Sequence, residues 1–188
     1  TFPLGDFGGA RHESGCDYPD IDKPTDRAIA DSIAYVPHIA EGIGLDARNE
    51  FLCLSREGPG QDVLFDKTAF IHGIGMTAAD YAEVAREGAS LIWSPRGNLD
   101  LYGHTAPVTL AAKMGIVIAL GTDWPAGGSI NMMRELRCAA DFNERNLRGY
   151  FTDRELFDMA TKNGAAALHS DDVIGVLAPG RVADVTIF

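Results

Sequence analysis

The sequence has 188 residues, of which 46% are hydrophobic and 23% charged, and its formal net charge at pH 7 is −11. This much apolar material is enough for a core and argues against a disordered chain. The negative charge, with no basic stripe to offset it, argues against nucleic acid as a partner. The sequence contains no run of 18 or more apolar residues, so no membrane span is predicted.

Short apolar runs alternate with segments of helical spacing over most of the chain. Residues 1–32 are rich in Gly, Pro and Asp and predict a long loop. After them, a strand followed by a helix is expected four times. The expected strands end near His38, near His72, in 89–95 and in 116–123, and the expected helices span 45–58, 77–88, 104–115 and 129–147.

Two helix starts carry a recognisable signal. Thr77 and Asp80 have the spacing of a capping box, in which each side chain bonds the backbone N–H of the other residue. Thr152 and Glu155 have the same spacing and predict one further helix over 152–168.

The last segment differs from the strand–helix repeat. Residues 174–188, "IGVLAPGRVADVTIF", predict two short strands around a turn at Pro179 and Gly180. We expect 170–188 to be the start of a small β domain.

Polar side chains follow the apolar runs where the strands end. The runs are continuous rather than alternating, which is typical of a parallel sheet buried on both faces. His38, His72, Ser94 and Asp123 come at or just after these runs. Because ligands bind at the carboxyl ends of parallel strands, we expect these residues on one functional rim.

The residue types on this rim suit a metal ion. A lone histidine at a strand end is more often a hydrogen-bonded structural residue, and Glu41 alone is more often a surface charge. Together, however, His38, Glu41, His72 and Asp123 supply two imidazoles and two carboxylates, the ligands that zinc prefers. A metal in an open site lowers the pKa of its water towards ~7, and a nearby carboxylate can then take and return the proton.

Six segments in order resemble the amidohydrolase superfamily, in particular its cytosine deaminase, guanine deaminase and chlorohydrolase branch. "HIAEG" is similar to the motif of the fifth barrel strand, "FIHG" to the sixth, "LIWSPRGNLDLYG" to the seventh and "ALGTDW" to the eighth. "GSINMMREL" resembles the start of the eighth helix, and "IGVLAPGRVADVTIF" the return to a small β-sandwich.

The resemblance implies a role for each rim residue. His38 would be a metal ligand, and His72 would lie over the water or substrate or bind a metal directly. Asp123 would bind the metal and receive the water proton, and Glu41 would carry a proton to the leaving nitrogen.

Three further residues are candidates for substrate binding. Arg96 would meet an anionic substrate group, Asn98 would contact substrate or position its loop, and Trp124 would line the pocket. A purely structural role in the loop or beneath the pocket is about equally expected for these side chains.

One expected feature of this family is absent from the sequence. An H-x-H pair opens the barrel in such proteins, but the five histidines here are all isolated. A (β/α)8 TIM barrel needs about 250 residues, so we expect an α/β fold comprising only its C-terminal half, about strands 5–8. Residues 1–32 would be the connection from the missing half, 33–169 the partial barrel and 170–188 the start of the β-sandwich.

Half a barrel has exposed strand edges, which favour pairing with further strands. We therefore expect a fragment, a chain with residues left out, or a swapped homo-oligomer. The function expected of the whole protein is metal-dependent hydrolysis of non-peptide C–N bonds in a small-molecule substrate, as in a deaminase or a cyclic amide or amidine hydrolase. The cofactor would be one Zn, with Fe or Mn as alternatives. The competing hypothesis is a non-catalytic fragment or pseudoenzyme.

The three cysteines, Cys16, Cys53 and Cys138, are scattered and include no CxxC pair. They predict neither a disulfide framework nor a thiolate zinc site. A cytoplasmic location is expected, with the periplasm and secretion as alternatives.

Overall fold

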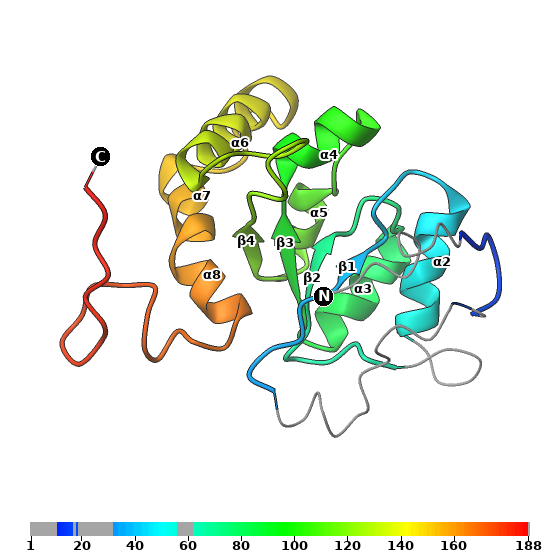
Figure 1. The fold of residues 1–188 in the computed structure, drawn as a ribbon, viewed down its shortest axis with the longest axis horizontal. Helices are drawn as coiled ribbons and strands as arrows, with labels where there is room; N and C mark the ends of the chain where they lie inside the picture. The colour runs from blue at the N-terminus through cyan, green and yellow to red at the C-terminus, as the bar shows by residue number, and fades with distance from the viewer. Residues whose placement is uncertain (1–10, 17, 19–31, 56–61, 188) are drawn as a thin grey trace.

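The computed structural model describes residues 11–16, 18, 32–55 and 62–187. Within these residues the chain alternates strands and helices, as expected (Figure 1). The strands are β1 (His38–Ile39), β2 (Ala69–His72), β3 (Ser90–Trp93) and β4 (Ile118–Leu120). The helices are α2 (Leu45–Leu54), α3 (Ala78–Arg86), α4 (Pro95–Tyr102), α5 (Val108–Lys113), α6 (Met132–Asn146), α7 (Asp153–Ala160) and α8 (Lys162–Ala167).

The four strands form one parallel sheet in the order β1-β2-β3-β4. Ile92 at its centre pairs with Ile71 on one side and with Ala119 on the other. Parallel neighbours need crossover connections, and helices supply them: α2 connects β1 to β2, α3 connects β2 to β3, and α4 and α5 connect β3 to β4. Helices α6, α7 and α8 follow β4 in the chain and stand beside it (Figure 1). The expectation of an α/β fold with a parallel sheet is therefore confirmed, and all four strands direct their carboxyl ends to one edge.

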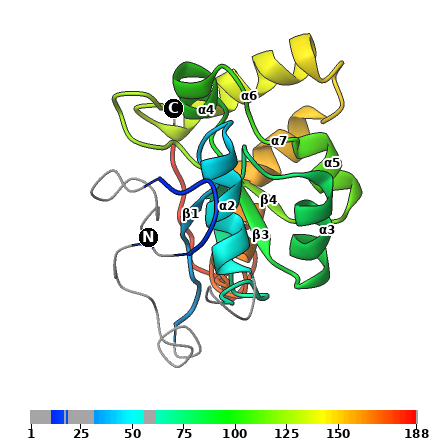
Figure 2. The same cartoon turned by 90° about the vertical axis from the view of Figure 1, so that its right-hand side faces the viewer.

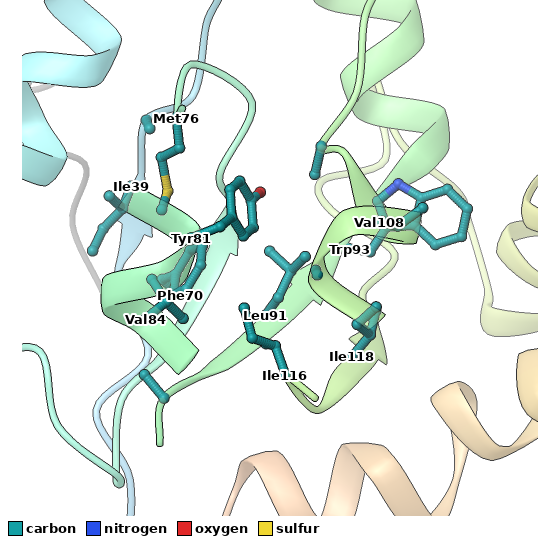
Figure 3. Close-up of a cluster of buried hydrophobic side chains, with 14 of the residues drawn as sticks. Ile39, Phe70, Met76, Tyr81, Val84, Leu91, Trp93, Val108, Ile116 and Ile118 are labelled. Atoms are coloured by element: carbon teal, nitrogen blue, oxygen red, sulfur yellow. The ribbon is translucent and has the colours of Figure 1, made fainter. Parts of the chain in front are cut away.

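The core packs on both faces of the sheet, because alternate residues of a strand point to opposite sides. Phe70, Leu91 and Ile118 lie on one face and belong to a cluster with side chains of α3 and α5 (Figure 3). The neighbouring positions Ala69 and Ala119 belong to a second, smaller cluster that includes Ala167 of α8, Ile92 and Val36.

Both predicted capping boxes are present. The Thr77 side chain accepts a hydrogen bond from the Asp80 N–H, and the Asp80 carboxylate accepts one from the Thr77 N–H at 2.8 Å. Thr152 and Glu155 make the same reciprocal pair at the start of α7. These local signals fix the helix starts because they satisfy N–H groups that have no partner within the helix.

The helices differ from the expectation in two regions, 95–102 and 153–167. The single helix expected over 152–168 is divided into α7 and α8 at Thr161, whose φ of −127° and ψ of −93° are not helical. Helix α4 was not expected, since Gly97 and Asn98 are poor helix formers, but Pro95 at its first position favours the start. Among the described helices, none is long and apolar enough to cross a membrane.

The strands expected within 174–188 are not formed in the residues that are described there. Residues 170–187 contain no strand and run away from α8 as an extended loop (Figure 1). The hydrogen bond from the Val182 N–H to the Val173 carbonyl, at 3.0 Å, links the two arms of this loop. A strand needs a paired neighbour and a covered face, whereas most of these side chains are exposed.

The expectation that the cysteines form no disulfide is wrong. Cys16 and Cys53 are joined by a disulfide across a sequence separation of 37, with their Cα atoms 5.5 Å apart, and Cys138 is a free thiol. The bond ties residues 11–16 to α2, while most of the loop expected over 1–32 lies outside the described residues.

Candidate metal centre

Three side chains converge at the carboxyl edge of the sheet. His38, His72 and Asp123 each offer one ligand atom, and these three atoms lie within 4.8 Å of one another. The two imidazole ring centroids are 5.3 Å apart. His38 opens the short strand β1, His72 ends β2, and Asp123 follows β4 by three residues, so the parallel sheet brings them to the same edge.

The backbone at two of these residues is unusual. His72 has a φ of 76° and Asp123 a φ of 58°, in the left-handed region that few residues other than glycine adopt. Such conformations cluster at functional sites, where the surrounding structure holds them in place. Two glycines leave space for the backbone and side chain around Asp123. A Cβ on Gly97 would overlap the Asp123 carboxylate, and a Cβ on Gly128 would overlap the Thr122 carbonyl.

A chain of buried hydrogen bonds orients His72, whose side chain is fully buried. Its Nδ1 lies 2.8 Å from Oδ1 of Asn98, and the Asn98 amide donates to Oγ1 of Thr105 at 3.0 Å. Oγ1 of Thr105 also accepts the Trp93 indole N–H at 2.7 Å. Because the Asn98 oxygen is left as the acceptor, the proton of neutral His72 belongs on Nδ1, and Nε2 is the nitrogen that can bind a metal.

Glu41 lies between His72 and α4. One carboxylate oxygen is 3.4 Å from His72 Nε2, and the other accepts the Tyr102 hydroxyl at 3.1 Å. A cavity of about 230 Å³ opens beside it, and its lining includes Asp46, Glu50 and Tyr102. Glu41 therefore lies between His72 of the candidate metal centre and this cavity.

The protonation of His38 suits a metal ligand. Burial lowers the pKa of His38, and the neighbouring His72 lowers it further, while Glu41 and Asp123 oppose the shift. Neutral imidazole is the form that binds metals. In the part of the chain that the structure describes, Nδ1 of His38 and Oδ2 of Asp123 are buried without a hydrogen-bond partner. Buried polar atoms of this kind are rare, so the donor set fits a divalent cation.

The remaining predicted residues have different surroundings. Asn98 is buried and contacts His72. The Arg96 backbone N–H donates to Oε1 of Glu135 at 3.0 Å. Burial raises the pKa of both Glu135 and Cys138, and the nearby Arg96 charge partly opposes each shift, which places Arg96 near α6. Trp124 is exposed, with 62% of the residue's surface accessible, and the Trp124 backbone N–H donates to the Asp123 carboxylate at 2.8 Å.

Sequence reasoning missed three residues around this centre, namely Tyr102, Thr105 and Glu135. Tyr102 and Thr105 carried no signal. The partner of Tyr102, Glu41, is 61 residues away, and the contact of Thr105 with Asn98 depends on helix α4, which was not expected. Glu135 did carry one: with Ala139 and Asn143 it forms a stripe at spacing i, i+4, i+8, and all three are buried. An acid on such a stripe of a helix faces the interior.

Comparison with known proteins shows the family to which the chain belongs. Residues 28–188 match the amidohydrolase family. The chain belongs to this family.

Two curated relatives are named 5-methylthioadenosine/S-adenosylhomocysteine deaminase. The one from Teredinibacter turnerae is 36% identical over 121 residues, 63% of this chain and 27% of that protein. The one from Nitratidesulfovibrio vulgaris is 31% identical over 156 residues, 80% of this chain and 35% of that protein. The chain thus spans about a third of the length of the curated relatives it matches.

Two solved structures of named hydrolases have a fold similar to that of this chain. E. coli guanine deaminase superposes with a TM-score of 0.67 at 25% identity, over 80% of this chain and 36% of that chain. The zinc complex of atrazine chlorohydrolase TrzN from Arthrobacter aurescens TC1 gives a TM-score of 0.66 at 26% identity, over 80% of this chain and 35% of that chain.

Proposed function

We propose that the protein carrying this chain is a metal-dependent hydrolase of non-peptide C–N bonds, acting as a deaminase of a cyclic amidine. The observation that carries this proposal is the convergence of His38, His72 and Asp123 within 4.8 Å at the carboxyl edge of the sheet. The names of the relatives support it, since they describe deaminases of adenosine derivatives and of guanine.

The chain would be the second half of a (β/α)8 barrel, with β1–β4 as barrel strands 5–8 and residues 170–188 leading into a small β-sandwich. The open sheet supports this arrangement, because the outer edges of β1 and β4 have no strand neighbour among the described residues. Strands from the rest of the protein, or from a second copy in a homo-oligomer, would cover these edges.

One Zn²⁺ is the ion that two imidazoles and a carboxylate favour, with Fe or Mn as alternatives. His38, His72 and Asp123 would hold it. When bound, such an ion makes a water molecule nucleophilic near neutral pH.

The side chains around the centre would handle the protons. The Asp123 carboxylate would accept the proton of the attacking water, because its Oδ2 is buried and has no described hydrogen-bond partner. Glu41 would donate a proton to the leaving nitrogen, since it lies between His72 and the cavity. Asn98 would fix the His72 ring, and the exposed Trp124 ring would stack on a flat substrate.

The second candidate is that this chain, as given, is a non-catalytic fragment or pseudoenzyme. Its five histidines are all isolated, so no H-x-H pair within the chain supplies two further ligands. Zinc titration of the 188-residue chain tests this candidate, and tight stoichiometric binding with hydrolytic activity would rule it out.

The test is ammonia release by the whole zinc-loaded protein on 5-methylthioadenosine, guanine and an amino-triazine, together with its metal content. We expect about one zinc per chain and turnover of at least one of these compounds, with Asp123→Asn abolishing release. Full activity of Asp123→Asn would contradict the proposed proton acceptor. A whole protein that binds no zinc and releases no ammonia would instead support the pseudoenzyme.

A further inference from the structure

Glu135 is an acid in an unexpected place. Its side chain is fully buried on the inner stripe of α6, where Ala139 follows one turn later. Burial raises the pKa of the Glu135 carboxyl, and the hydrogen bond from the Arg96 N–H opposes that shift. Acids are almost never fully buried unless they are paired, so a specific contact must compensate for the burial.

One such contact is with the start of another helix. Helix α4 begins at Pro95, and its N-cap residue Ser94 makes no side-chain capping bond. Pro95 has no N–H, so the first N–H in need of an acceptor is that of Arg96, and Oε1 of Glu135 accepts it at 3.0 Å. Helix α6, which packs against α4, thus supplies the cap that α4 lacks. A carboxylate in this position also interacts favourably with the helix dipole.

The same first turn of α4 contacts two members of the candidate metal centre. Gly97 backs the Asp123 carboxylate so closely that an added Cβ would overlap it. Asn98 holds Nδ1 of His72 at 2.8 Å. Three consecutive residues of α4 therefore contact Glu135, Asp123 and His72 in turn: Arg96 and Asn98 by hydrogen bonds and Gly97 by close packing. A shift of this turn would move both candidate ligands.

We propose that Glu135 is a positioning residue for the candidate metal centre. By accepting the Arg96 N–H it fixes the first turn of α4, and through Gly97 and Asn98 that turn sets the places of Asp123 and His72. The inference rests on the proposed function only in naming the cluster a metal centre, since the contacts from Glu135 to His72 are present in the chain without an ion.

The test compares three variants of the whole protein. Glu135→Gln keeps an oxygen that can accept the Arg96 N–H, whereas Glu135→Leu keeps the size and removes the acceptor. Asn143→Leu is the matched control, because Asn143 lies on the same buried stripe but bonds the backbone of Phe151, at 2.8 and 3.0 Å, and not α4. The readouts are Co²⁺ affinity, the visible absorption band of bound Co²⁺, and the free energy of unfolding.

We expect Glu135→Leu to weaken Co²⁺ binding at least about tenfold, the scale on which residues behind metal ligands act, and to change the absorption band. Glu135→Gln should restore both, and Asn143→Leu should lower stability with affinity and band unchanged. Wild-type affinity and band in Glu135→Leu would overturn the inference. An equal loss of Co²⁺ affinity in Glu135→Leu and Asn143→Leu would also overturn the inference, because general destabilisation would then explain the effect.

A second readout separates this inference from the proposed function. If the whole wild-type protein binds no Co²⁺, the proposed function fails. The positioning role of Glu135 is then tested by the NMR resonances of the His72 ring in the metal-free protein. A shift of the His72 Nδ1–H signal in Glu135→Leu but not in Glu135→Gln supports the positioning role. Unchanged His72 resonances in both variants overturn it.

Discussion

Asn98 and His72 are joined by a buried hydrogen bond of 2.8 Å between Oδ1 and Nδ1, although they come from different elements. Replacing Asn98 with Leu would leave the Nδ1–H of His72 buried without an acceptor. We expect a loss of about 1–3 kcal/mol in the free energy of unfolding and loss of the fixed tautomer. Nitrogen NMR of the His72 ring measures the second effect, and unchanged ring signals in Asn98→Leu would contradict the assignment.

Thr105 orients the Asn98 side chain for this bond, because the Thr105 hydroxyl accepts hydrogen bonds from both the Asn98 amide and the Trp93 indole N–H. In Thr105→Val the side chain keeps its shape, and two buried donors lose their acceptor. We predict destabilisation of at least about 2 kcal/mol, more than for one lost hydrogen bond, as measured by urea unfolding. Thr105→Ser is the control, and it should retain most of the stability because the hydroxyl remains.

His38 makes stability depend on pH. Its pKa in the folded protein is lowered below the ordinary value of 6.5 by burial and by His72. Between these two pKa values the unfolded chain binds more protons, so the free energy of unfolding falls as the pH drops through 6.5. Below the folded-state pKa the loss levels off. Urea unfolding of the metal-free protein between pH 8 and pH 5 measures this slope, and we expect His38→Asn to make it shallower. An identical slope in the variant would show that other groups cause it.

Gly97 and Gly164 offer a matched pair of glycine substitutions within helices. A Cβ on Gly97 would overlap the Asp123 carboxylate, while a Cβ on Gly164 meets nothing closer than 3.9 Å. Gly164→Ala should therefore raise stability by up to about 1 kcal/mol through helix propensity alone. Gly97→Ala should displace Asp123 and weaken Co²⁺ binding by the whole protein. Equal metal affinity in the two variants would contradict the close contact.

The disulfide between Cys16 and Cys53 should contribute to stability, because it closes a loop with a sequence separation of 37. Cross-links of this span are worth about 4 kcal/mol through the unfolded chain. Urea unfolding with and without reductant measures the effect, and reductant should have no such effect on a variant with Ser at both positions. Thiol titration of the native chain should find Cys138 alone, and three reactive thiols would contradict the bond.

The sequence indicated the convergence of His38, His72 and Asp123 because the rule behind it is local. Each apolar run is visible by itself, and parallel strands always end at the same edge. The capping residues Thr77 and Thr152 were predictable for the same reason, since all partners lie within one helical turn.

The contacts that were missed link residues far apart in the chain. Cys16 and Cys53 are separated by 37 residues, and Glu41 and Tyr102 by 61. Neither pairing follows from periodicity, because it depends on how α2 and α4 pack at the edge of the sheet. The strands expected within 174–188 were wrong because the pattern shows only that a segment can form a strand. Formation requires a neighbour to pair with, which residues 170–187 lack among the described elements.

The left-handed backbone at His72 and Asp123 decides which substitutions can be interpreted at the centre. Most residues adopt this conformation at a cost of about 1–2 kcal/mol, whereas Asn is among the few that tolerate it. Asp123→Asn and His72→Asn thus remove the carboxylate or the imidazole and leave the main chain undisturbed. Alanine at either position would mix a loss of chemistry with a change of backbone energy, and a β-branched residue would do so more strongly. Asparagine is therefore the replacement whose effects at His72 and Asp123 can be attributed to the lost side chain.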